Sequence, residues 1–252
     1  MAVKDEGSEF LIRVTDLQKA FGRQKVLNGI SLQVKRGETV AVLGRSGGGK
    51  SVLLKLIIGL QAPDGGSIQV AGKEITKLDE NQLNEVRKRI GFLFQQAALY
   101  DSLTVEDNVA FPLSRHSKMS NNERSKRVRE LLADVGMDRD LGKMPSEISG
   151  GMQKRVGLAR ALALDPEILL FDEPTAGLDP ITAAEIGDLI VKLKRKRKMS
   201  AVVVTHDVRG ASAYSDRMVL LHKGNIAAEG TFDDLQGSRD EFVNQFFSYG
   251  SR

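Results

Sequence analysis

The sequence predicts an α/β protein in which a strand-and-helix core is interrupted by a mainly helical insertion. Strand-length apolar runs alternate with helical patterns at the start of the chain and again after about residue 165. Between about Asp79 and Leu164 the pattern is mostly helical, and no internal repeat is visible. A chain of 252 residues can bury one substantial core. We therefore expect one α/β core with an inserted helical subdomain.

Composition narrows the class of protein. The chain has 41% hydrophobic residues, a net charge of +4 and no cysteine, so it forms no disulfide or thiolate metal site. No run approaches the roughly 18 to 20 apolar residues of a membrane helix, and the N-terminus lacks the apolar core of a signal peptide. These features favour a cytosolic chain that reaches a membrane only through a partner.

A basic run, residues 192–198, could suggest a nucleic-acid or anionic-lipid surface. It ends a predicted helix, however, where cations complement the helix dipole. With 5% aromatic residues and no tryptophan, the chain also has few side chains for stacking on bases. We favour a solvated helix end and expect no nucleic-acid partner.

The first predicted elements are strands over 11–14, 30–34 and 39–43, followed by a glycine-rich segment. A helix is expected over 50–60, with Leu53, Leu56, Ile57 and Leu60 on one face. A turn at 62–66 then leads into a strand over 67–71.

The later elements follow the same logic. A strand is expected over 90–94, and Ser120 with Glu123 forms a capping-box pattern before a helix. Further strands are expected over 168–171, 201–205 and 218–221. A helix should bury Ile186, Leu189, Ile190 and Leu193, and a short helical tail ends the chain.

The glycine-rich segment reads Gly44-Arg45-Ser46-Gly47-Gly48-Gly49-Lys50-Ser51. The pattern G-x-x-x-x-G-K-S between a strand and a helix is typical of a phosphate-binding loop. Its glycines let backbone amides turn toward phosphates at the positive end of the next helix. Lys50 would place its charge near the β- and γ-phosphates, and Ser51 would offer a hydroxyl to Mg²⁺. A chance glycine-rich turn is the alternative, and the strand-loop-helix context argues against it.

A second candidate cluster is Asp172-Glu173, which closes the apolar run 168–171. Ligands bind at the carboxyl ends of strands in open α/β sheets, so both side chains are expected at a ligand site. Asp172 would coordinate Mg²⁺ through water, and Glu173 would orient or deprotonate the water that attacks the γ-phosphate.

Ser149-Gly150-Gly151-Met152 begins another apolar-periodic helix. Helix amides and a capping serine make a second anion site, and a head-to-tail dimer closing one half-site against the other across ATP would explain both. A simple helix cap is the alternative reading of this segment taken alone.

Three more residues follow predicted strands or the acidic pair. His206 follows 201–205, Gln95 follows 90–94 and could contact Mg²⁺ or the attacking water, and Asp179 lies on the loop after Glu173. His116 and His222 lack such placement, and we interpret both as ordinary surface residues.

In this order, the motifs resemble those of the ATPase subunit of ABC transporters over essentially the whole chain. In that family's terms, 44–51 resembles Walker A, Gln95 the Q-loop, 149–152 the signature and 168–173 Walker B. Asp179 resembles the D-loop and His206 the switch histidine. Phe21 matches the aromatic residue that stacks on adenine, although tyrosine is commoner there; a half-buried strand aromatic is the alternative.

One departure refines the resemblance. Met152 stands where the signature usually has glutamine, and the same methionine occurs in MlaF-like ATPases of MCE-linked phospholipid transporters. The segments 49–55, 101–113 and 144–147 also resemble that subgroup. Some members carry a C-terminal extension that grips the neighbouring subunit, which a chain ending at Arg252 puts in doubt.

The resemblance implies a nucleotide-binding core at about 8–95 and 165–235, with a mainly parallel sheet and an N-terminal antiparallel β subdomain. It implies a helical subdomain at about 96–164 and a tail at 236–252. The implied ligands are ATP and Mg²⁺. Catalytic residues would be Lys50, Gln95, Glu173 and His206, and metal ligands Ser51, Gln95 and Asp172. The implied nucleotide contacts are Phe21, Gly44, Arg45, Ser46, Gly47, Gly48, Gly49, Lys50, Ser51, Val52, Ser149, Gly150, Gly151, Met152 and Asp179.

The implied partners are a second copy of the chain, an integral-membrane permease, an MCE lipid-binding subunit and a small cytoplasmic regulatory subunit. The implied location is the cytoplasmic face of the bacterial inner membrane, with 96–102 as the surface that couples to the permease. Three alternatives stay open: an importer of amino acids or metals, a non-transport ABC protein that uses ATP as a clamp, and an interaction module without catalysis.

Overall fold

The computed structural model describes residues 9–250, which form two compact units. The first unit holds the described residues up to Arg87 and those from Ser200 onward, and the second holds Lys88–Met199. The predicted helical subdomain, 96–164, lies within the second unit. The predicted partition of the chain into core, helical subdomain and tail stays a prediction.

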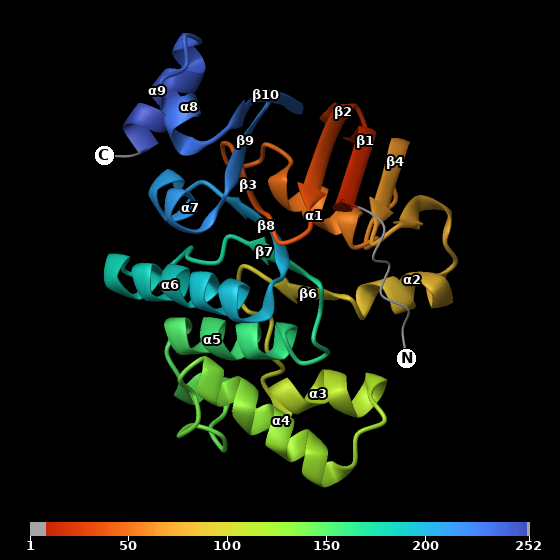
Figure 1. The fold of residues 1–252 in the computed structure, drawn as a ribbon, viewed down its shortest axis with the longest axis vertical. Helices are drawn as coiled ribbons and strands as arrows, with labels where there is room; N and C mark the ends of the chain where they lie inside the picture. Colours follow the sequence, from red (N-terminus) through yellow and green to blue (C-terminus); the bar gives the residue numbers. More distant parts are fainter. Residues whose placement is uncertain (1–8, 251–252) are drawn as a thin grey trace. The chain divides into compact units, whose positions relative to one another are not determined.

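The first unit contains two sheets (Figure 1). An antiparallel sheet has the order β2-β1-β4-β5, and a second sheet contains the order β10-β9-β3-β8, in which β3 pairs in parallel with β8 and β9. The strands are β1 (Phe10–Phe21), β2 (Gln24–Lys35), β3 (Thr39–Leu43), β4 (Gly65–Val70), β5 (Lys73–Glu74), β8 (Ser200–Thr205), β9 (Arg217–His222) and β10 (Asn225–Gly230).

Helices connect these strands. They are α1 (Lys50–Ile57), the 3-10 turn η1 (Ile75–Lys77), α2 (Glu80–Arg87), α7 (Val208–Tyr214), α8 (Phe232–Gln236) and α9 (Glu241–Gly250). Every residue of β3 and β8 is buried, which matches their continuous apolar sequences and the shielding of parallel strands on both faces.

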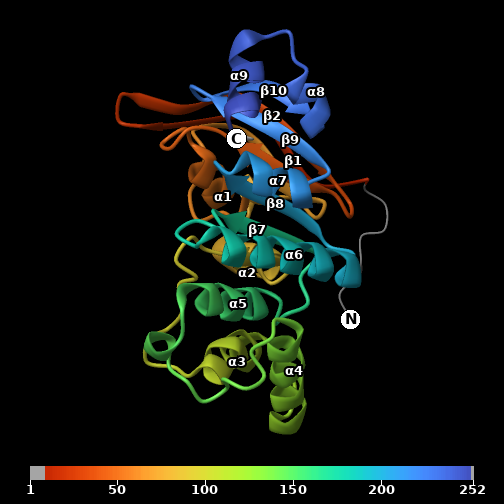
Figure 2. The ribbon, with the colours of Figure 1, turned by 90° about the vertical axis from the view of Figure 1, so that its left-hand side faces the viewer.

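The second unit pairs β6 (Ile90–Leu93) in parallel with β7 (Ile168–Asp172). Its helices are α3 (Val105–His116), α4 (Asn121–Asp134), the 3-10 turn η2 (Pro145–Glu147), α5 (Gly150–Ala161) and α6 (Pro180–Arg197). Helix α5 contacts β6, α3, α4 and α6, and in Figures 1 and 2 it lies between the strands and the α3–α4 pair. The centre of this unit is therefore α5.

The fold class is confirmed, with a mixed α/β arrangement, an antiparallel N-terminal sheet and helical insertions. The capping box is present as well: the Ser120 amide donates to the Glu123 carboxylate at 2.8 Å, and the Glu123 amide donates to the Ser120 hydroxyl. The predicted core face of α6 is also correct, since Ile186, Leu189 and Ile190 are buried together with Leu193.

The predicted end of α1 was wrong. The helix stops at Ile57, and Leu60, expected on its buried face, is 53% exposed. Gly59 adopts a left-handed conformation with φ 69°. The Gly59 amide donates to Leu56 O at 3.0 Å and the Leu60 amide to Lys55 O at 2.8 Å, which is the Schellman pattern that ends a helix.

The extent of β1 and β2 was also underestimated. Each runs for 12 residues, because their antiparallel pairing continues through register shifts past the polar residues where the apolar alternation stops. Strand β10 was missed because its Ala-Ala-Glu-Gly sequence has little β propensity. His222 is not an ordinary surface residue: it is half-buried, with its ring 4.2 Å from that of Phe242.

The basic run ends α6 as expected, but two of its residues are not merely solvated. Lys196 pairs with Asp134 at 2.6 Å. Arg197, whose side chain is 12% exposed, pairs with Asp134 at 3.1 Å and with Asp165 at 2.9 Å. Part of this positive charge therefore ties α6 to α4 and to the turn before β7.

Candidate functional site

In the first unit, the phosphate loop and His206 follow neighbouring strands. Residues Thr39–Leu43 of β3 pair in parallel with Ala201–Thr205 of β8, and Leu43 lies opposite Thr205. Because parallel strands end at the same edge of a sheet, the loop that begins at Gly44 and the exposed His206 leave from one edge. The structure thus brings two of the predicted motifs together within this unit.

The start of α1 suits an anion. Its N-cap, Gly49, makes no side-chain cap hydrogen bond, and the first turn carries no acidic residue. Gly49 has φ 95°, and a Cβ there would lie 2.9 Å from Leu27 Cδ2 and 3.0 Å from Val26 O. Glycine is therefore needed for both conformation and packing, and α1 begins without a capping or acidic side chain that would compete with a phosphate.

Lys50 is the first residue of α1 and is 6% exposed. Its ammonium donates hydrogen bonds to Gly44 O at 2.9 Å and Arg45 O at 3.2 Å. Ser51 and Val52 follow it, both half-buried. The loop thus combines a held ammonium, a hydroxyl and backbone amides, which is the donor set expected for the phosphates of ATP.

Phe21 ends β1 and is 45% exposed, with the Lys19 ammonium 5.5 Å from its ring centroid. An exposed aromatic face at a strand end fits stacking on a base better than it fits core packing. Its contact with adenine stays a prediction.

In the second unit, Gln95 and the acidic pair follow β6 and β7, which lie side by side with Leu93 opposite Phe171. Asp172 is the last residue of β7 and is 8% exposed, and Glu173 follows it at 9% exposed. Gln95 itself is exposed. The predicted metal ligand Gln95 and the two carboxylates therefore share one edge of the sheet within this unit.

Glu173 has a left-handed backbone, with φ 48°. A residue other than glycine pays about 1–2 kcal/mol for this conformation. The Glu173 carbonyl accepts hydrogen bonds from the Ala176 amide at 3.2 Å and from the Lys154 ammonium at 3.1 Å. Such strain persists only where surrounding contacts impose it, and it is commonest at functional positions.

The N-termini of α5 and α6 lie together in the second unit. The Ser149 hydroxyl accepts from the Met152 amide at 3.3 Å, which confirms Ser149 as the N-cap of α5. A Cβ on Gly151 would lie 2.5 Å from Thr182 Cγ2 of α6. Close contact between these helix starts thus requires glycine at 151.

Asp179 is the N-cap of α6 and accepts from the Ile181 and Thr182 amides at 3.1 Å and 3.0 Å. Hydrogen bonds from the Thr182 hydroxyl and amide lower the pKa of Asp179, so it stays ionised as a cap. The structure assigns it a local role at the start of α6, and its contact with nucleotide stays a prediction.

Two cations of α5 were missed by the sequence reasoning. Lys154, 5% exposed, donates to the carbonyl oxygens of Gln95 and Glu173. Arg160 donates to Ala97 O at 2.6 Å and Ala98 O at 2.7 Å, both of which have positive φ. A signal was present: Lys154 lies on the same helical stripe as buried Gly151, Leu158 and Leu162, where a charge is unexpected.

The protein oxygen donors suit Mg²⁺ held mainly by phosphates and water. The predicted ligands are one hydroxyl, one amide and one carboxylate, and no group of three or more His, Cys, Asp or Glu able to hold a metal occurs among residues 9–250. Mg²⁺ is commonly bound through one or two carboxylates plus substrate phosphates rather than by an all-protein cage. Within the second unit, Gln95 and Asp172 supply an amide oxygen and a carboxylate that suit this mode.

Met152→Gln is expected to change kcat for ATP hydrolysis by no more than about twofold. Met152 is half-buried, and its visible contribution is a backbone amide that glutamine would retain. Glutamine has a side chain of similar length, and substitutions away from the core and from buried polar networks usually stay within about 0.5 kcal/mol. Steady-state ATPase assays should show this, with Gly151→Ala as the damaging control because of the close Thr182 contact. A tenfold loss in Met152→Gln would mean that the side chain touches nucleotide or a partner.

Known proteins resemble the chain in both sequence and structure. The family model described as "ABC transporter" matches residues 27–176. A protein named TRIGALACTOSYLDIACYLGLYCEROL 3, chloroplastic, from Arabidopsis thaliana is 41% identical and aligns with 96% of the chain and 74% of its own length. The methionine import ATP-binding protein MetN of Brucella abortus is 42% identical, and the alignment covers 87% of the chain but 59% of MetN.

A solved structure agrees with these relatives. The ATP-binding cassette MJ0796, in a dimeric post-hydrolysis state bound to ADP and Pi, superposes with a TM-score of 0.81 at 36% identity, covering 87% of the chain and 98% of MJ0796. The family match spans more than half of the sequence, and it includes both the phosphate loop and the acidic pair. The chain therefore belongs to the ABC transporter family, as an ATP-binding and ATP-hydrolysing domain.

Proposed function

We propose that the chain is the ATPase subunit of a transporter that moves phospholipid between the inner and outer membranes of a bacterium and maintains lipid asymmetry. The observation that carries the cargo assignment is Met152. The signature usually has glutamine at this position, and the chain resembles the MlaF-like ATPases of phospholipid transporters in having methionine there. The name of the Arabidopsis relative is that of a glycerolipid, which supports a lipid cargo.

The proposed mechanism assigns each motif a task. The α1 amides and the Lys50 ammonium bind and orient the β- and γ-phosphates, and Phe21 stacks on the base. Ser51, Gln95 and Asp172 would hold Mg²⁺, and the ion would supply positive charge to the phosphoryl oxygens. Glu173 accepts a proton from the water that attacks the γ-phosphorus, and the bond to the β-γ bridging oxygen breaks. His206 contacts the γ-phosphate region from the end of β8.

The working form is proposed to be a homodimer across ATP. ABC ATPase cassettes dimerise and pair with membrane permease subunits, and the similar cassette MJ0796 was solved as a dimer. The chain carries two helix N-termini suited to phosphate, those of α1 and α5, and they belong to different units. In a head-to-tail dimer, α1 of one copy and α5 of the other would bind the same ATP.

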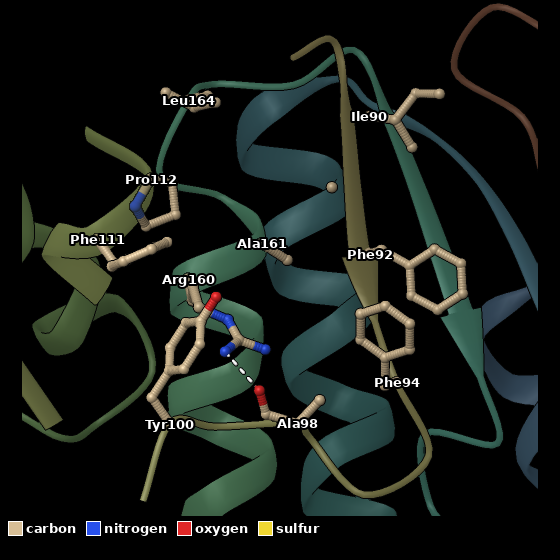
Figure 3. A pocket seen from close by; sticks show the side chains of 11 residues that line it. Ile90, Phe92, Phe94, Ala98, Tyr100, Phe111, Pro112, Arg160, Ala161 and Leu164 are labelled. Atoms are coloured by element: carbon tan, nitrogen blue, oxygen red, sulfur yellow. Dashed lines mark hydrogen bonds between the residues drawn. The ribbon is translucent and has the colours of Figure 1, made fainter. Parts of the chain in front are cut away.

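A cavity in the second unit supports permease docking close to the Q-loop (Figure 3). It has a volume of about 410 Å³, and Tyr100 and Ala98 line it together with Phe92, Phe94 and Phe111. Tyr100 is 46% exposed, an unusual exposure for a large ring. Figure 3 shows the Arg160 side chain beside Tyr100, with its hydrogen bond to the carbonyl oxygen of Ala98. An apolar helix of the permease would fit this aromatic cavity.

The other proposed partners are an MCE lipid-binding subunit and a small cytoplasmic regulatory subunit. Among residues 9–250, no helix has both the length and the apolar character needed to cross a bilayer. The proposed location follows from pairing with the permease: it is peripheral, at the cytoplasmic face of the inner membrane.

Affinity purification from native membranes is expected to recover a permease together with glycerophospholipid. Tyr100→Asp should lower permease recovery about tenfold, because docking would bury an unpaired carboxylate. Met119→Asp, at an exposed apolar residue outside the cavity, is the matched control and should leave recovery unchanged. Equal recovery with Tyr100→Asp would contradict docking at this cavity. Mass spectrometry of the recovered complex identifies both partner and lipid.

Amino-acid import is the second candidate, since MetN matches with an identity as high as that of the Arabidopsis protein. The same purification separates the two functions. A permease that arrives with a solute-binding protein and no lipid would favour import, whereas lipid with an MCE subunit favours the proposed function.

A further inference from the structure

Lys154 is a buried cation whose ammonium is engaged by backbone rather than by a carboxylate in direct contact. It lies in the first half of α5 and is 5% exposed. Its Nζ donates to the carbonyl oxygen of Glu173 at 3.1 Å and to that of Gln95. An ammonium has three donors, and burying one without partners is costly, so these contacts define where the side chain must lie.

The two carbonyls belong to the segments that carry the predicted chemistry. Gln95 follows β6 and Glu173 follows β7, and these strands pair in parallel. Lys154 thus bridges the exits of two neighbouring strands at the point where the amide and carboxylate side chains leave the backbone. Both segments contain left-handed residues other than glycine: Glu173 itself, and Ala97 with Ala98 after Gln95. Such backbone needs external contacts to hold it.

We propose that Lys154 is a positioning residue for ATP hydrolysis, whose ammonium locks the Glu173 peptide to the Gln95 peptide and so fixes the direction of the Glu173 carboxylate. The inference rests on the proposed role of Glu173 in activating water. A displacement of about 1 Å at a reacting group can cost on the order of 10²-fold in rate, so holding this peptide has a kinetic consequence.

The position of Lys154 on α5 indicates that its ammonium is needed for more than packing. Gly151, Leu158 and Leu162 share the helical stripe with Lys154 and are apolar and buried. A buried charge is often no more stabilising than a well-packed apolar residue of similar volume. Packing alone would therefore be served by leucine or methionine, whereas two carbonyls from different strands can be joined only by a donor. Burial lowers the pKa of Lys154 below its ordinary value, and the carboxylates of Asp172 and Glu173 partly oppose that effect.

The test removes the ammonium and keeps an unbranched side chain that is one heavy atom shorter. Lys154→Met is expected to lower kcat about 10- to 100-fold, the usual cost of removing a group that orients an active-site residue, with ATP affinity within about twofold of wild type. Lys154→Arg should restore most of the rate. Lys196→Met, at an exposed cation of the same unit, is the matched control. Nucleotide titration and thermal melting of each full-length variant accompany the rates.

Three results would overturn the inference: a wild-type kcat in Lys154→Met, no rescue by arginine, or a rate loss matched by loss of ATP binding and of melting temperature. A double-mutant cycle with Glu173→Gln distinguishes a positioning role from a purely structural one. In a Glu173→Gln background, Lys154→Met should have almost no further effect, since the carboxylate it positions is gone. If Lys154→Met lowered kcat by the same factor in the wild-type and the Glu173→Gln protein, the inference would be overturned.

The outcomes also separate this inference from the proposed function. If Glu173→Gln alone leaves hydrolysis near wild type, the role of Glu173 fails. If Glu173→Gln is inactive while Lys154→Met is fully active, only the positioning role of Lys154 fails.

Discussion

Replacing Glu173 by glutamine is expected to lower kcat for ATP hydrolysis by about 10³-fold, within the range of general-base catalysis. Glutamine keeps the size of the side chain and its carbonyl oxygen, but its amide cannot accept the proton of the attacking water at neutral pH. The backbone contacts from Ala176 and Lys154 involve the Glu173 carbonyl and are retained. ATP binding should therefore remain, and the variant should accumulate as an ATP-bound dimer.

Steady-state hydrolysis, ATP titration and size-exclusion chromatography with ATP together measure this result. Glu130→Gln, at an exposed carboxylate on α4, is the matched control and should behave as wild type in all three. Hydrolysis near the wild-type rate in Glu173→Gln would contradict the general-base assignment. A loss of ATP binding of the same size would instead point to a structural defect.

Lys50→Ala is expected to weaken ATP binding by about 10- to 100-fold, because charge-assisted hydrogen bonds contribute roughly 1.5–3 kcal/mol each. The ammonium is 6% exposed and already held toward the loop by Gly44 O and Arg45 O, so little ordering entropy is lost when phosphate binds. Alanine removes the charge but leaves the α1 amides, which explains why binding should be weakened and not abolished.

Titration with a fluorescent ATP analogue in the presence of Mg²⁺ measures this affinity. Lys55→Ala provides the control, since Lys55 lies on the same helix with an exposed side chain. An unchanged dissociation constant in Lys50→Ala would count against the phosphate-loop role. A lower melting temperature in both variants would indicate loss of helix stability instead.

Local sequence patterns predicted the parts of the fold whose cause is local. The capping box of α4 involves Ser120 and Glu123, three residues apart, and it forms as expected. The buried strand before Gly44 and the helix after it could be predicted, because the apolar run, the glycines and the helical spacing of apolar residues follow one another directly in the sequence. The end of α1 was predicted wrongly because the helical spacing of apolar residues continues to Leu60. The left-handed turn at Gly59 stops the helix before that residue.

Contacts between elements explain the other predictions that were wrong. Strand β1 continues to Phe21 because β2 pairs with it out to Phe21 opposite Gln24, whereas β4 pairs with it only as far as Gln18. An alternation pattern does not reveal this pairing. His222 was expected at the surface because it lacks the strand-end placement of the motif residues, yet its ring lies against that of Phe242 from α9 in a tilted contact. In both cases the deciding contact is with another element of the fold, which the local sequence pattern does not show.

The sequence by itself determined the α/β class, the motif residues from Gly44 to His206 and the nucleotide chemistry they imply, because these depend on residue type and short spacing. The tertiary structure alone decided that Lys154 joins the exits of β6 and β7, and that aromatic residues around Tyr100 enclose a cavity. The reason is physical: a carbonyl acceptor has no signature in sequence. The two carbonyls that Lys154 joins lie 59 residues before it and 19 residues after it in the chain, which is beyond the reach of a local pattern.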